Sequence, residues 1–166
     1  MTEAIIRKYE LLADSKLTVL GVDLFRVRAL VSFGPVSAGD VGGYVRAEDN
    51  LSHAGAAWVS GDAWVYGAAR VYGDAQVYGN AWVYGDARVS EPRHCLTVGP
   101  LGSRAATLTV CRDSTLSVSY ATGCFFGSRE AFLAAVEATH GDSPIGNVYA
   151  AAVMLADHVV PPYTQE

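Results

Sequence analysis

Several features that would place a protein in a familiar class are missing from this sequence. No apolar run approaches the ~20 residues of a membrane-spanning helix, and the start, MTEAIIRKYELLADSK, lacks the basic head and apolar core of a signal peptide. Charged residues make up only 17% of the chain, the net charge is -5, and the lysines are Lys8 and Lys16 alone. Such a chain offers no basic surface for duplex nucleic acid. We therefore expect a cytoplasmic protein that contacts neither a membrane nor duplex nucleic acid.

Cysteine is also scarce, and its pattern excludes some chemistry. The three cysteines, Cys95, Cys111 and Cys124, form no CxxC pair, and their odd number fits buried, reduced thiols better than a disulfide framework or a zinc site. No HxxxxH-like histidine pair supports the metal centre of a zinc hydratase. Walker-type and GxGxxG fingerprints are absent as well. We predict no metal and no cofactor.

The sequence does contain a plain six-residue repeat. From Gly55 to Ser90 it reads GAAWVS GDAWVY GAARVY GDAQVY GNAWVY GDARVS, with glycine first, alanine third and valine fifth in every unit. A period of six does not match a helix, but it fits a short strand and a corner, with alanine and valine pointing inward. Three units form one triangular coil, and coils stack at ~4.8 Å through parallel ladders. We predict a mainly β protein with a short parallel β-helix over residues 43–90.

The repeat also predicts which side chains stack. If the six-residue period is continued to the residues before Gly55, Val45 and Leu51 occupy the third position of a unit, where the repeat has alanine. His53 then occupies the fifth position, where the repeat has valine. In the repeat itself, residues 18 apart lie above one another, which pairs Arg70 with Arg88 on one flank. The same spacing stacks aromatic side chains on one another, or on Gln76 in the case of Trp58. We predict that these aromatic rings form an oligomer interface: Trp58, Trp64, Tyr66, Trp82 and Tyr84. Two alternatives stay open: the rings form a platform on which a flat ligand stacks, or the C-terminal residues cover them.

So short a β-helix needs support at its ends. Fewer than three coils give a thin core, and both ends expose unpaired strand edges. We therefore expect a homo-oligomer, with a trimer as the first choice. Flanking segments supply caps: residues 1–42 are predicted to hold a helix and a hairpin, and residues 91–166 a small α+β domain.

The flanks carry their own local signals. Ile5, Ile6, Tyr9 and Leu12 recur at helical spacing, and a hairpin follows around Gly21. In the C-terminal part, strands are expected at 94–98, 106–112 and 114–120. One helix is expected to begin after Ser128 and to end at Gly141. A second is expected to begin at Pro144 and to end before Pro161 and Pro162.

Several segments together resemble a known group of sequences. The stretch from GVDLFRVRALV to LSHAG, the GDAxVY units, HCLTVGPLGSR and GCFFGSREAFLAAVEATHGD resemble a family of uncharacterised phage and prophage proteins over nearly the whole chain. The resemblance implies a phage protein in a bacterial host cytoplasm, and no activity comes with it. The repeat also resembles the hexapeptide-repeat family, which implies a left-handed β-helix.

The C-terminal block supplies the parts of an anion site. GPLGSR (99–104) offers a hydroxyl and a guanidinium, and GCFFGS (123–128) ends where a helix N-terminus favours an anion. The candidate ligand-binding residues are Gly102, Ser103, Arg104, Arg112, Phe125, Gly127 and Ser128. The plainer interpretation is that GPLGSR is a turn with a solvated arginine, and that GCFFGS is the start of a helix with its aromatic residues in the core. The hypothesis is a non-enzymatic protein that binds a small anionic ligand and sequesters a host nucleotide defence signal.

Two other classes of function stay open. Many hexapeptide-repeat proteins resemble CoA-dependent acyltransferases, in which a histidine acts as general base, and His94 is the candidate because its phase points outward. The shortage of lysine for CoA phosphates counts against an enzyme, and His53 is expected to be a packed core residue. Cys124 is expected to be buried rather than nucleophilic. The third class is a structural or assembly protein that uses the aromatic flank.

Overall fold

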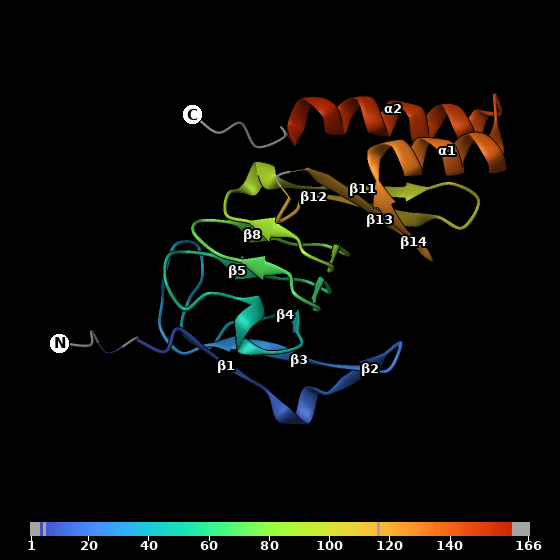
Figure 1. The fold of residues 1–166 in the computed structure, drawn as a ribbon. Coiled ribbons are helices and arrows are strands. Elements are labelled where there is room, and N and C mark those ends of the chain that lie inside the picture. The colour runs from blue at the N-terminus through green and yellow to red at the C-terminus, as the bar shows by residue number, and fades with distance from the viewer. Residues whose placement is uncertain (1–3, 5, 116, 161–166) are drawn as a thin grey trace.

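The structure is a computed structural model that describes residues 4, 6–115 and 117–160. Figure 1 shows its parts in tiers: the N-terminal strands at one end, the repeat coils next, then a C-terminal sheet, and two helices on the far side of that sheet. The fold is mainly β, as predicted, and the two helices lie at the C-terminal end.

The N-terminal segment is built from strands rather than a helix. Strand β1 (Tyr9–Leu11) pairs antiparallel with β3 (Val22–Ala29), which also pairs with β2 (Leu17–Val19) across Gly21. The hairpin is therefore confirmed, whereas the helix predicted from Ile6, Tyr9 and Leu12 is wrong; Ile5 lies outside the described residues. Tyr9 is fully buried beside the repeat, and this long-range packing overrides the local helical spacing.

The repeat folds as predicted, into short strands in parallel columns. The columns are β4–β6–β9, β5–β8 and β7–β10. The paired valines lie 18 residues apart along the chain in β5–β8, β6–β9 and β7–β10. Their bounds are β4 Val41–Val45, β5 Trp58–Val59, β6 Trp64–Val65, β7 Arg70–Val71, β8 Gln76–Val77, β9 Trp82–Val83 and β10 Arg88–Val89. Every third-position alanine and fifth-position valine of the repeat is buried, and the corner glycines have φ between +61° and +68°. These residues form the stacked coils of a β-solenoid.

The first coil has a different length from the others. Val45 pairs with Val65 and Leu51 bridges Val71, so each offset is 20 residues rather than 18. Two extra residues lie between Leu51 and Trp58, which brings the chain back to the 18-residue register. The predicted upstream phase is therefore wrong: Val45 and Leu51 occupy valine slots, and His53 lies in the enlarged corner.

The C-terminal part is a four-stranded antiparallel sheet covered by two helices. Strands β11 (Cys95–Leu101), β12 (Ala106–Arg112), β13 (Val118–Thr122) and β14 (Phe125–Ser128) follow one another in chain order. The helices are α1 (Arg129–His140) and α2 (Pro144–Val159), and neither helix, within the described residues, has the length and hydropathy to cross a membrane.

The helix boundaries confirm the sequence signals, but one strand was missed. The Ser128 hydroxyl accepts from the Ala131 N–H at 3.1 Å, Gly141 follows α1, and Pro144 begins α2. Pro161 and Pro162 lie outside the described residues. The segment 125–128 is a strand paired with β13, not a loop at the helix start.

The two faces of this sheet bury different partners. One face packs against α1 and α2 through Leu108, Val110 and Tyr120. The opposite face closes the end of the solenoid: the Thr109 hydroxyl accepts from the Trp82 N–H at 3.0 Å, and Phe126 lies 4.7 Å from the Tyr84 ring. The sheet therefore caps the last coil.

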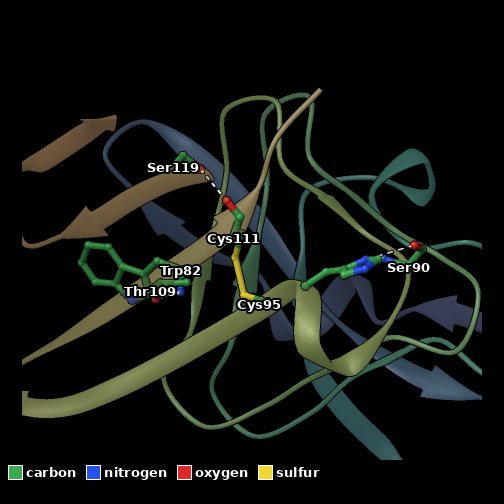
Figure 2. Close-up of a disulfide and its surroundings, with 7 residues drawn as sticks. Trp82, Ser90, Cys95, Thr109, Cys111 and Ser119 are labelled. Atoms are coloured by element: carbon green, nitrogen blue, oxygen red, sulfur yellow. Dashed lines mark hydrogen bonds between the residues drawn. A yellow bond between two sulfur atoms is a disulfide. The ribbon is translucent and has the colours of Figure 1, made fainter. Parts of the chain in front are cut away.

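A disulfide lies at this junction (Figure 2). Cys95 and Cys111 are directly opposite each other in the β11–β12 ladder and are joined through their sulfurs. Cys95 follows Val77 by 18 residues and packs against the solenoid core. The prediction of reduced thiols is wrong for this pair, because hairpin register brings together two residues that are distant in sequence. The expected burial of Cys124 is also wrong, since it is exposed in the β13–β14 turn.

Candidate functional site

A cavity among the described residues lies on the flank of the solenoid that carries the two stacked arginines. It has a volume of about 440 Å³, within the range of roughly 300–1,000 Å³ usual for small-ligand sites. We call it the arginine cleft; its lining residues are Glu48, Asp49, Leu51, Ser52, His53, Arg70, Val71, Tyr72 and Arg88. The sequence predicted the arginine pair but not the acidic wall that lines the same cavity.

The basic wall comes from two neighbouring coils. Arg70 and Arg88 are paired in the β7–β10 ladder, where strands are ~4.8 Å apart. Arg88 is anchored, because its Nη1 donates to the carbonyl oxygens of Ala68 at 2.8 Å and Ala87 at 3.0 Å. The Arg70 side chain is exposed, and its guanidinium makes no hydrogen bond or ion pair with the part of the chain that the structure describes. Like charges directly opposite in a sheet repel, and an anion between them would relieve that repulsion.

The acidic wall is a short 3-10 turn, η2 (Glu48–Asn50), held by its last residue. The buried Asn50 amide donates to the carbonyl oxygens of Gly67 and Ala69, and its Oδ1 accepts from the Ala47 N–H. This fixes Glu48 and Asp49 at the mouth of the cleft. An ion pair with Arg7 holds the pKa of the Glu48 carboxyl below its ordinary value. Asp49 makes no hydrogen bond or ion pair with any described residue.

His53 lies behind this wall. Its Nδ1 accepts from the Lys8 backbone N–H at 3.2 Å, so the proton of the neutral ring is on Nε2. That Nε2 is buried without a hydrogen-bond partner among the described residues, and it lies 3.6 Å from the Glu48 carboxylate. The ring stacks on Tyr9 at 4.2 Å. His53 is thus half-buried and packs on Tyr9, but it lies in the enlarged corner and not in the inward core slot that the sequence predicted.

The structure does not gather the predicted ligand-binding residues into one pocket. Ser103 and Arg104 are exposed in the β11–β12 turn, beyond Leu101 and Ala106. Ser128 lies at the other end of the sheet, in a row with Ser119 and Cys111. Five residues of strand separate the two ends, or roughly 17 Å. An anion cannot contact Arg104 and the α1 N-terminus together.

The other members of that predicted set have structural surroundings. Phe125 packs in the core 5.3 Å from Phe132, so its ring is not free to stack on a base. Gly102 lies under the Tyr149 hydroxyl, where a Cβ would be 2.3 Å away, and Gly127 pairs with Tyr120 in the sheet. Arg112 lies at the Ser128 end and contacts His94. The plainer interpretation of both motifs therefore fits the structure better.

His94 is buried rather than outward-facing, which corrects the sequence prediction. Arg112 can only donate, so Nε2 of His94, 2.5 Å away, must accept. Nδ1 lies 3.1 Å from the Ser90 hydroxyl and 3.4 Å from the Ser90 backbone nitrogen, so this ring nitrogen is also engaged. Burial, and then the Arg112 charge, lower the pKa of His94. With both nitrogens engaged, His94 is poorly placed to act as a general base.

Four of the five predicted interface rings form a half-buried ladder. Trp64 stacks on Trp82 at 4.8 Å and Tyr66 on Tyr84 at 4.9 Å, as the 18-residue spacing predicts. Trp58 is an exception that corrects the prediction: it is only 4% exposed, because the N-terminal segment covers it with Tyr9 and Phe33. We call the remaining four rings the aromatic ladder.

A comparison with known protein families agrees with the stacked coils seen in the structure. The fold defines a β-solenoid repeat protein, and residues 75–91 match a family described as the YdcK beta solenoid repeat. This segment contains β8, β9 and β10. No curated protein matches the chain.

Proposed function

We propose that this β-solenoid is a non-enzymatic binding protein whose arginine cleft holds a small anionic ligand. The observation that carries the proposal is Arg70, an unpartnered guanidinium in the described part of the chain, beside Arg88 in a cavity of about 440 Å³. A planar guanidinium donates two parallel hydrogen bonds to a phosphate or carboxylate, which gives both affinity and orientation.

The rim of the cleft supports a ligand with a flat ring. Tyr72 is 39% exposed and lines the cavity, so a base could stack on it. An anionic nucleotide therefore belongs among the candidate ligands. A phage origin, which the sequence resemblance implies, is part of this proposal. So is the sequestration of a host nucleotide signal, for which the support is the exposed Tyr72 ring beside the two arginines and not the resemblance.

The aromatic ladder supports a second part of the proposal, that the protein is a homotrimer of left-handed coils. Its four rings are only half-buried by the chain itself, and contiguous aromatic surface is typical of an interface. The same surface would serve the alternative of a structural or assembly protein. The acyltransferase alternative has less support, because Arg112 and Ser90 engage both nitrogens of His94.

Isothermal titration calorimetry tests the binding proposal. Inorganic phosphate and a panel of linear and cyclic nucleotides are titrated into the wild-type protein, Arg70→Gln and the control Arg46→Gln, an exposed arginine outside the cleft. We expect at least one ligand to bind wild type and Arg46→Gln equally and Arg70→Gln about tenfold more weakly, the loss of about one charge-assisted hydrogen bond. Absence of binding across the panel would reject the proposal.

A further inference from the structure

Some of the charged side chains that line the arginine cleft have partners within the protein, and others have none. Glu48 is paired with Arg7, and the nearby His53 Nε2–H also faces its carboxylate. On the basic side, Arg88 is anchored through Nη1 to backbone carbonyl groups. Two lining groups of opposite sign then have no ion pair or hydrogen bond within the described chain: the Arg70 guanidinium and the Asp49 carboxylate.

These two groups favour different parts of one ligand. A purely anionic molecule would gain contacts from Arg70 but would also meet the negative charge of Asp49 in the same cavity. A molecule with a cationic group at its other end turns that repulsion into attraction. Because the cavity is partly enclosed by protein, both interactions are stronger than they would be in bulk water.

We propose that the cleft is specific for a zwitterionic ligand, a phosphate monoester that also carries an ammonium group. The phosphate binds Arg70 and the free N–H groups of Arg88, and the ammonium binds Asp49. Two adjacent guanidinium groups match the double charge of a phosphate monoester better than the single charge of a carboxylate. This inference rests on the proposed function and narrows its ligand class.

The fixed neighbours explain why Asp49, rather than Glu48, receives the ammonium. Arg7 already neutralises Glu48. Asp49 lies on the same 3-10 turn, which Asn50 ties to the coil below, so its backbone is held in place while its carboxylate stays exposed. Because the backbone is already held, only the side-chain rotamer of Asp49 has to be ordered on binding.

The probes are three small molecules that share parts: phosphoethanolamine, inorganic phosphate and ethanolamine. Each is titrated calorimetrically into the full chain as wild type, Asp49→Asn and Arg70→Gln. Asp74→Asn and Arg46→Gln are matched controls, since both positions are exposed and outside the cleft. Asp49→Asn keeps the size of an exposed side chain, and an unchanged thermal midpoint verifies that the variant folds.

We expect wild type to bind phosphoethanolamine about tenfold more tightly than phosphate, and ethanolamine weakly or not at all. Asp49→Asn should abolish the preference while phosphate still binds, Arg70→Gln should weaken both phosphates, and both controls should behave as wild type. Equal affinity for phosphate and phosphoethanolamine, or a preference that survives Asp49→Asn, overturns the zwitterion inference alone. If no phosphate or nucleotide binds wild type, the proposed function fails as well.

Discussion

The corner glycines of the solenoid share one backbone conformation but meet different surroundings. Gly55 and Gly79 both have φ of +68°, a region that L side chains rarely adopt. A Cβ at Gly55 would lie 2.4 Å from the carbonyl oxygen of Gly73, whereas nothing lies within 4 Å of one at Gly79. The conformational cost of alanine is therefore the same at both positions, and only the steric cost differs.

This pair gives a prediction at the scale of the residue. Gly79→Ala should lower the free energy of unfolding by about 1–2 kcal/mol, the cost of left-handed backbone for an L residue. Gly55→Ala should cost about 1–3 kcal/mol more, because a backbone oxygen in the next coil has to move. Urea unfolding of both variants measures the difference. Equal losses would show that the corner relaxes without strain.

At the scale of the element, η2 depends on a single buried amide. Asn50 makes three hydrogen bonds, two to the coil below and one to Ala47. Asn50→Ala leaves the buried Ala69 carbonyl and two partly buried backbone groups unpaired, so we expect a loss of about 2–4 kcal/mol in the free energy of unfolding. Asn80→Ala, at an exposed corner position, should change it by less than about 0.5 kcal/mol. Chemical denaturation checks both, and comparable losses would contradict the anchoring role.

The repeat was predictable because each unit carries its own signal. Glycine, alanine and valine recur every six residues, so a local rule determines strand, corner and stack together. The 20-residue first coil breaks that rule between Leu51 and Trp58. If the period were unbroken, the polar His53 would occupy an inward position that the repeat fills with valine. That mismatch was the sign in the sequence that the register changes there.

Non-local pairing explains the other misses. The β1 strand forms because it pairs with Val27–Ala29, and the Cys95–Cys111 contact requires the β11–β12 register. In the candidate site, the spacing predicted that Arg70 and Arg88 would be neighbours. Asp49 could not be placed in the same cavity, because its position depends on the irregular first coil.

At the scale of the whole molecule, the aromatic ladder predicts association. If Trp64, Trp82 and their tyrosine neighbours form the trimer interface, a charge among them should separate the subunits, because a charge buried in an interface without a partner is strongly unfavourable. We expect Trp64→Glu to shift the mass measured by light scattering from trimer to monomer. Tyr78→Glu is the control, since Tyr78 is 62% exposed and lies outside the ladder. A monomeric wild type would contradict the trimer.

The junction between the solenoid and the C-terminal sheet should be sensitive to acid. Neutral His94 links Ser90 at the last coil to Arg112 on β12. Since its folded pKa is lowered from the ordinary 6.5, the unfolded chain takes up a proton first as the pH falls. This contribution to stability is present above about pH 6.5 and is lost as the pH falls below it.

The measurement compares urea unfolding between about pH 7.5 and about pH 5. Wild type should lose more stability over this range than His94→Gln, which keeps a neutral polar side chain but cannot titrate. His158→Gln is the control, because His158 is exposed on α2, and it should follow wild type. The nearby Glu91 opposes the lowered pKa and Arg93 adds to it, so the acid sensitivity belongs to the cluster. If His94→Gln shows the same pH slope as wild type, protonation of His94 does not control the junction.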